Sequence, residues 1–130
     1  MSSNVTLVKE LYEHFAKKDN DSIRALFQDD IVWVQMKGFP DGGRFEGADE
    51  IFHNVFQNFR DNWIQWETIV DEYLEAENSV LVIGRYEGGY RVTGKSVSAE
   101  FVHRYQFRDD KIAKFTQYTD TLLIHQAMQD

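Results

Sequence analysis

Apolar residues recur at helical spacing in three segments of the N-terminal half. The first stripe consists of Leu7, Val8, Leu11 and Phe15. The second consists of Ile23, Leu26 and Phe27, and the third of Phe52, Val55, Phe56 and Phe59. Positions three or four residues apart share one face of a helix, so the stripes predict three helices that each bury one side. The first helix is expected over about residues 4–18.

The pattern changes to period two in the strands that we expect. The segment Ile31–Met36, with the sequence IVWVQM, is rich in β-branched and aromatic residues and predicts a strand between the second and third helices. Residues 37–43 predict a loop from their Gly, Pro and Asp content. From Trp63 onward the alternation predicts four consecutive antiparallel strands, followed by a short terminal helix. The third of these strands is long and is expected to bend near Gly94.

This long strand carries a continuous apolar face with one histidine in it. The face consists of Val97, Ala99, Phe101, His103, Tyr105 and Phe107. The intervening positions are mostly polar, as expected for the opposite face of a strand. If residues 108–111 form a two-residue turn, His103 lies opposite Thr116 on the last strand. The hydrophobic positions of that strand do not share one parity, so we expect a β-bulge between Ile112 and Tyr118.

Three helices with an inserted strand, followed by four antiparallel strands, predict a single α+β domain over residues 1–130. We expect a strongly curved antiparallel sheet with the three N-terminal helices packed on its concave face. Such a sheet leaves a conical cavity. The aromatic share of 15% suggests that rings line this cavity, which favours a small apolar molecule as the partner.

Charge and composition exclude several classes of function. The formal net charge of −8 argues against nucleic acid and anionic membrane surfaces, because both bind cationic surfaces. The chain has no cysteine, so disulfides and thiolate metal sites are excluded. No segment has the length of a signal peptide core or a membrane span, and we expect a cytoplasmic protein.

Three segments, in their order along the chain, resemble a known family. They are LYEHFAKKDNDSIRALFQDDIVWV, FEGADEIFHNVF and SAEFVHRYQFRDDKIAKFTQYTDT. They resemble the nuclear-transport-factor-2-like (NTF2-like, cystatin-like) superfamily, in its branch of SnoaL-like polyketide cyclases and ketosteroid-isomerase-related proteins. The resemblance implies a cone-shaped α+β fold with a deep pocket, frequently as a homodimer. The family includes isomerases, cyclases and dehydratases as well as non-catalytic binders, so the fold alone does not define the function.

The resemblance also implies roles for individual residues. The general-base aspartate of ketosteroid isomerases matches Gln35, which cannot take a proton at neutral pH, so steroid isomerisation by that mechanism is disfavoured. The aspartate that SnoaL-like cyclases place on the final strand matches Asp120. Their histidine on the preceding strand matches His103.

We therefore expect Asp120 as the catalytic base or acid and His103 as its polar assistant. A carboxylate in an aromatic pocket has a raised pKa, which suits general acid–base catalysis. The expected substrate-binding residues are Trp33, Gln35, Phe56, Trp63, Phe101, Tyr105 and Tyr118. The sequence contains no recognisable set of metal ligands or cofactor motif, so we expect neither a metal nor a cofactor.

Structural roles remain open for both catalytic candidates. His103 could be a buried histidine bonded to a tyrosine or to a backbone carbonyl. Asp120 could cap a helix that begins at Thr121. The function expected from the sequence is cofactor-free acid–base chemistry, of the isomerase, cyclase or dehydratase type, on an apolar carbonyl compound. The alternative is a non-catalytic ligand-binding or dimeric interaction module with the same fold.

Overall fold

The computed structural model describes residues 3–130. The helices are α1 (Ser3–Lys17), α2 (Asn20–Ala25), α3 (Ala48–Ile51), η1 (Phe52–Phe56), α4 (Gln57–Asn62) and α5 (Thr121–Met128). The strands are β1 (Phe27–Gln35), β2 (Gly43–Glu46), β3 (Trp63–Ala76), β4 (Ser79–Tyr90), β5 (Ser96–Arg108) and β6 (Lys111–Thr119). None of the described helices is both long and apolar enough to cross a membrane.

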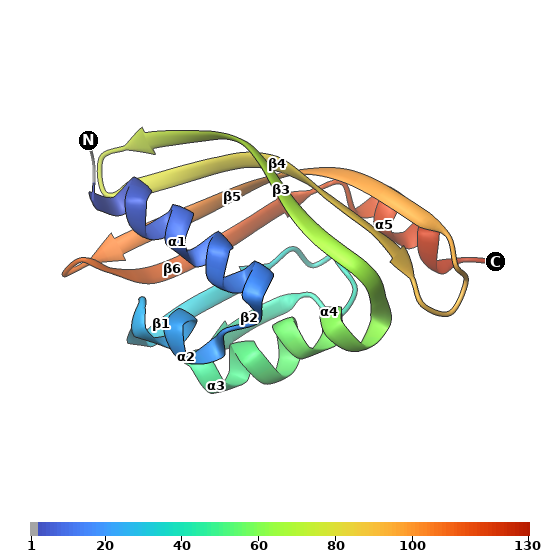
Figure 1. Ribbon diagram of the computed structural model, residues 1–130, viewed down its shortest axis with the longest axis horizontal. Coiled ribbons are helices and arrows are strands. Elements are labelled where there is room, and N and C mark those ends of the chain that lie inside the picture. Colours follow the sequence, from blue (N-terminus) through green and yellow to red (C-terminus); the bar gives the residue numbers. More distant parts are fainter. Residues whose placement is uncertain (1–2) are drawn as a thin grey trace.

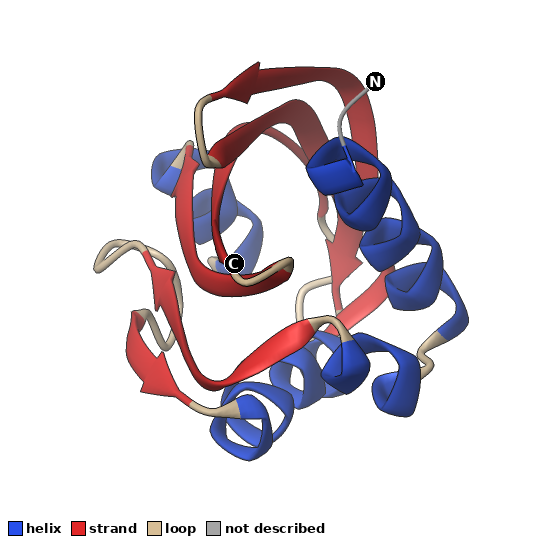
Figure 2. Cartoon of the chain, turned by 90° about the vertical axis from the view of Figure 1, so that its left-hand side faces the viewer, coloured by secondary structure: helices blue, strands red, loops and turns tan. Residues whose placement is uncertain are grey.

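All six strands belong to one sheet, in the order β2-β1-β6-β5-β4-β3. Strand β1 runs parallel to β6, and every other neighbouring pair is antiparallel. The sheet curls strongly, and helices α1 to α4 lie along its open side (Figures 1 and 2). The expected α+β class with a curved sheet and helices on the concave side is confirmed.

Three boundaries differ from the sequence prediction. The second helix ends at Ala25, and Phe27 begins β1. The Phe27 side chain packs in the core from this strand position, where it is 3% exposed. A short strand, β2, pairs with β1 where only a loop and a helix start were expected. Gly94 has a φ of +75° and lies in the turn between β4 and β5. It therefore belongs to the turn of this hairpin and does not bend a strand.

A β-bulge shifts the register between β5 and β6. Gln106 pairs with Lys114 and Phe107 pairs with Ile112, which leaves Ala113 as the extra residue. The bulge therefore lies inside the range expected from the sequence. Beyond it, His103 lies opposite Gln117, one residue from the position that a regular ladder would give. The shift turns the side chains of residues 115 and 117 to the inner face of the sheet.

The inner face of the sheet contains most of the core. On β5 the alternating positions 97–105 are all buried, as the sequence pattern predicted. Strand β6 adds Phe115, whose ring stacks on Trp33 of β1 with the centroids 3.7 Å apart. The third predicted helix is one helical stretch with a π-helical turn at residues 52–56, which places Phe56 against Trp33 with ring centroids 5.4 Å apart.

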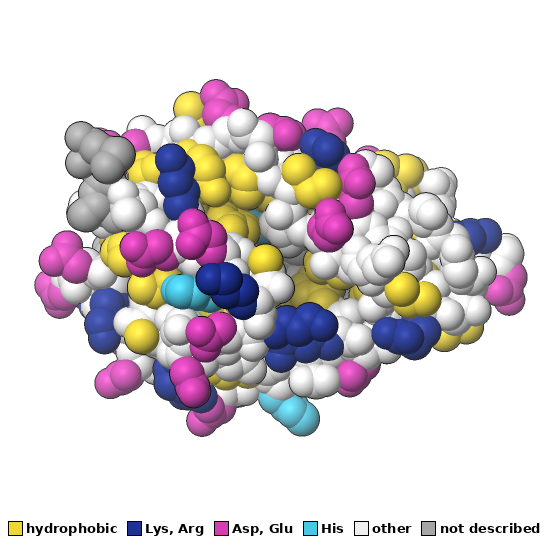
Figure 3. Space-filling model, viewed as in Figure 1, with side chains coloured by type: hydrophobic (Ala, Val, Ile, Leu, Met, Phe, Trp, Pro, Cys, Tyr) yellow, Lys and Arg dark blue, Asp and Glu magenta, His cyan; other side chains and the backbone are white. Residues whose placement is uncertain are grey.

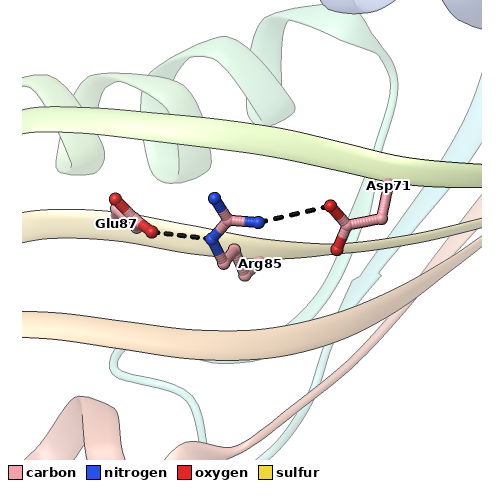
Figure 4. A network of polar contacts seen from close by, with 3 residues as sticks. All are labelled: Asp71, Arg85 and Glu87. Carbon is pink, nitrogen blue, oxygen red and sulfur yellow. Dashed lines mark hydrogen bonds and ion pairs between the residues drawn. The ribbon is translucent and has the colours of Figure 1, made fainter.

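The outer face of β3 and β4 carries a network of exposed charges (Figure 4). Arg85 donates from Nε to Glu87 at 2.7 Å and from Nη1 to Asp71 at 3.2 Å. The pKa of Arg85 is raised, chiefly by its hydrogen bond to Glu87. Surface ion pairs of this kind contribute only about 0–1 kcal/mol to stability. The curvature of the sheet therefore depends on the packing of side chains on its inner face.

Candidate functional site

A cavity of about 670 Å³ lies between the inner face of the sheet and helices α1 and α4. Its lining is rich in aromatic side chains and comprises Phe15, Ala16, Lys18, Trp33, Gln35, Phe56, Phe59, Arg60, Trp63, Ile64, Gln65, Trp66, Glu67, Thr68, Ile69, Tyr86, Arg91, His103, Tyr105 and Phe115. The face shown in Figure 3 is hollowed between α1 and β3, with hydrophobic side chains visible in the hollow. The volume and lining suit a small organic molecule.

Most of the residues expected from the sequence meet at this cavity. Those in its lining are Trp33, Gln35, Phe56, Trp63, His103 and Tyr105. Phe101 lies behind the lining, where its ring stacks on His103 with the centroids 3.8 Å apart. Tyr118 is 49% exposed and lies outside the lining, because the bulge at Ala113 turns it to the outer face of the sheet.

The structure places Asp120 outside the cavity lining as well. Its side chain is exposed and accepts a hydrogen bond of 3.2 Å from the backbone N–H of Leu123. This contact makes Asp120 the N-cap of α5, which is the structural role left open by the sequence. Asp120 and His103 therefore do not form a pair in this geometry.

His103 instead lies in the middle of a buried chain of hydrogen bonds. Its Nδ1 is 2.7 Å from the hydroxyl of Tyr12 on α1, and its Nε2 contacts the hydroxyl of Tyr86 on β4. Tyr105 donates to Tyr12 at 2.9 Å, and Gln117 donates from Nε2 to Tyr86 at 2.9 Å. Gln117 is oriented by its Oε1, which accepts from the backbone N–H of residue 36 at 3.2 Å.

Burial decides the charge state of this chain. It lowers the pKa of His103 well below its usual range, because the interior disfavours the imidazolium ion. Burial is also the largest cause of the raised pKa of Tyr12, Tyr86 and Tyr105. At neutral pH the titratable groups of the hydrogen-bond chain are therefore a neutral imidazole and three protonated hydroxyls.

The buried hydrogen-bond chain has one more donor proton than its own hydrogen bonds use. Four hydrogen bonds join the five side chains. One proton of the Gln117 amide, three hydroxyl protons and one imidazole proton are available for them. Four contacts use four protons, so one hydroxyl proton is left to donate elsewhere.

Gln35 provides a second unused donor. Its Oε1 accepts a hydrogen bond of 3.0 Å from Nε1 of Trp33, which orients the amide. Within the described part of the chain, the Nε2 group has no partner, although the residue is only 5% exposed and lines the cavity. Gln35 and Tyr86 are therefore two buried residues of the lining that carry a polar group and lie among its aromatic side chains.

The site residues expected from the sequence did not include three members of the hydrogen-bond chain. Tyr86 follows Val80, Val82 and Gly84 on the buried positions of β4, so its parity was visible in the sequence. Tyr12 adjoins the apolar stripe of α1, and Gln117 reaches the inner face only through the bulge. Among residues 3–130, no group of three or more His, Asp or Glu side chains could hold a metal ion.

The fold and sequence are similar to those of known proteins. The model of the SnoaL-like domain family matches residues 8–115. An NTF2-like protein from Burkholderia thailandensis is 36% identical, with a TM-score of 0.94 and complete coverage of both chains. No functionally curated protein matches the chain.

Two further solved structures are similar in fold alone. TerC, co-crystallised with polyporic acid, is 23% identical, with a TM-score of 0.88, 99% of this chain and 100% of that chain covered. A candidate SnoaL-like polyketide cyclase from Shewanella denitrificans is 12% identical, with a TM-score of 0.82, 99% of this chain and 98% of that chain covered.

The lowered pKa of His103 predicts a loss of stability in mild acid. The unfolded chain takes up a proton on this histidine below about pH 6.5, whereas the folded chain does not, so the free energy of unfolding falls as the pH falls. Between pH 7.5 and 5.5 we expect His103 to account for a loss of about 1 kcal/mol. Urea unfolding of the wild type and of His103→Gln at both pH values measures this loss.

The other histidines are present in both proteins and cancel in the comparison. The variant should therefore lose less stability than the wild type over the same pH interval. An equal loss in the two proteins would show that His103 is not the group responsible.

Proposed function

The chain belongs to the SnoaL-like domain family of the NTF2-like superfamily, and from this premise we propose that it binds a flat, mostly apolar carbonyl compound. In the proposed complex the ligand lies in the aromatic cavity. Its oxygen accepts hydrogen bonds from Tyr86 and Gln35, and the carbonyl is polarised without a cofactor.

The spare proton of the buried chain carries this proposal. Because Tyr105 donates to Tyr12, the spare proton belongs either to Tyr12 or to Tyr86. If the proton were on Nδ1, His103 would donate to Tyr12, and the Tyr12 hydroxyl would have to donate its own proton elsewhere. Tyr12 lies outside the cavity lining, so this proton would have no acceptor, which costs about 1–3 kcal/mol. A proton on Nε2 lets Tyr12 donate to Nδ1 and leaves the proton of Tyr86 at the cavity wall.

The Tyr86 hydroxyl then accepts two hydrogen bonds, from Gln117 and from His103, and donates one. Hydrogen bonds in such a chain polarise one another, so the Tyr86 proton becomes a stronger donor than that of an isolated tyrosine. Donors fixed in a dry site stabilise negative charge on a ligand oxygen without reorganising. This is the physical basis for binding a carbonyl group, and for stabilising its enolate form, in this cavity.

The rest of the lining suits a planar ring system. All three tryptophans of the protein, Trp33, Trp63 and Trp66, are in it. Aromatic side chains provide large apolar areas and favour stacked or edge-to-face contacts. The same tryptophans also make occupancy of the cavity measurable by quenching of intrinsic fluorescence.

We expect the wild type to bind 9-fluorenone more tightly than fluorene, which has the same ring system without the carbonyl oxygen. Tyr86→Phe should lower this preference by roughly 3- to 10-fold, because one hydrogen bond to the oxygen is lost. Gln35→Met should act in the same direction and leaves the buried chain intact. Tryptophan quenching titrations give both dissociation constants.

Tyr90→Phe is the matched control, since Tyr90 lies on the same strand but outside the cavity lining. Its ratio of the two dissociation constants should equal that of the wild type. A ratio that stays unchanged in both Tyr86→Phe and Gln35→Met would reject the proposed oxygen site.

Catalysis is a second candidate function, favoured by one residue of the lining. That residue is Tyr86, whose hydroxyl could stabilise the negative charge on the oxygen while water takes a proton from the carbon next to the carbonyl. Glu67, the acidic residue of the described lining, pairs with Glu87 across β3 and β4 and so lies on the outer face of the sheet, away from Tyr86. The reaction would be cofactor-free acid–base chemistry of the isomerase or cyclase type.

Hydrogen–deuterium exchange of 2-tetralone tests this second candidate. The wild type should accelerate exchange at the carbon next to the carbonyl relative to protein-free buffer, and Tyr86→Phe should lower the rate by about 10²-fold or more. Tyr90→Phe makes the same chemical change outside the cavity lining and should keep the wild-type rate. Exchange no faster than in buffer would leave the non-catalytic ligand-binding module as the function.

A further inference from the structure

Most charged residues of the cavity lining are positive, although the chain as a whole is negative. The lining contains Lys18, Arg60 and Arg91 but only one acidic residue, Glu67, in a protein of net charge −8. Lysine and arginine side chains also border the hollow in Figure 3. We propose that the ligand carries a carboxylate or a similar acid group at its outer end, bound by Lys18 and Arg60. This inference rests on the proposed function, since it completes the ligand of the same cavity.

A polar contact ties Arg60 to the segment of the chain that contains Lys18. The guanidinium donates from Nη2 to Oδ1 of Asn20 at 3.1 Å, which ties α4 to the connection between α1 and α2. Lys18 lies in that connection, two residues before Asn20. A guanidinium has five N–H donors, so most of them remain available for an anion. Arg60 and Lys18 therefore present two positive charges from neighbouring segments.

These two charges are not neutralised by the protein itself. Within residues 3–130, neither Lys18 nor Arg60 takes part in an ion pair. The nearest acidic residues in sequence have other partners. Asp19 accepts hydrogen bonds from the N–H and hydroxyl of Ser22, and Asp61 accepts one from Gln57. An anionic group on a ligand would supply the missing counter-charge.

Arg91 has a different role. Its guanidinium donates to the backbone carbonyls of residues 60, 61 and 63, where α4 ends. Cations at this position satisfy the free carbonyls of a helix C-terminus. Arg91 thus positions the end of α4, including Arg60. We treat it as a positioning residue that does not bind the acid group itself.

The two ends of the lining then specify one class of ligand. The inner end is buried and offers the donors of Tyr86 and Gln35, which are 3% and 5% exposed. The outer end is more exposed and offers Lys18 and Arg60. Nine aromatic side chains also belong to the lining. A planar aromatic acid with a carbonyl oxygen at the opposite end matches both sets of groups.

The test compares 9-fluorenone with its 2-carboxylate and 4-carboxylate, which extend the same ring system by an anionic group in two directions. At about 20 mM NaCl, at least one carboxylate should bind the wild type about fivefold more tightly than 9-fluorenone. At about 300 mM NaCl this advantage should shrink, because salt screens an exposed ion pair. Tryptophan quenching measures all of the dissociation constants.

Arg60→Gln and Lys18→Gln should each remove most of the advantage and leave the binding of 9-fluorenone itself within about twofold. Arg44→Gln is the control, since it removes one positive charge from an exposed residue outside the lining. It should keep the advantage. Both variants of the proposed site change partly exposed or exposed side chains, so they should fold.

Two outcomes would overturn the inference. One is a wild type that binds neither carboxylate more tightly than 9-fluorenone, and the other is an advantage that persists in both Arg60→Gln and Lys18→Gln. If 9-fluorenone still binds in a manner that depends on Tyr86, only the acid group fails. If 9-fluorenone itself shows no preference over fluorene, the proposed function fails with it.

Discussion

The neutral imidazole of His103 is the constraint on which the rest of the interior depends. A buried histidine has to use both ring nitrogens in hydrogen bonds, because an unpaired polar group in the core costs about 1–3 kcal/mol. Tyr12 and Tyr86 meet this requirement from α1 and from β4, and Gln117 supports Tyr86 from β6. One residue of β5 thereby fixes a helix and two neighbouring strands relative to each other.

The bulge at Ala113 makes this arrangement possible. Without the extra residue, the ladder between β5 and β6 would place Thr116 opposite His103 and would turn Gln117 outward. With it, Gln117 is 1% exposed, while Tyr118 faces the outer side of the sheet. The same backbone feature that completes the hydrogen-bond chain therefore turns one of the residues expected from the sequence away from the cavity.

Much of the fold could be predicted from periodicity, and less of the site. The alternation along residues 97–105 correctly placed His103 on a buried face, and the mixed parity of the last strand correctly indicated a bulge. The partners of His103 come from segments 17 and 91 residues away, for Tyr86 and Tyr12, and no local pattern specifies such pairings. The cap formed by Asp120 was visible only as an alternative, since an aspartate before a helix suits both roles.

The position of the imidazole proton tests this account most directly. Nitrogen-15 NMR of the His103 side chain at pH 7 distinguishes a protonated from an unprotonated ring nitrogen. The account predicts a neutral ring with the proton on Nε2, which directs the hydroxyl proton of Tyr86 to the cavity. A proton on Nδ1, or an imidazolium ion at this pH, would contradict it, because Tyr86 would then have no spare proton for a ligand or the buried chain would carry a charge.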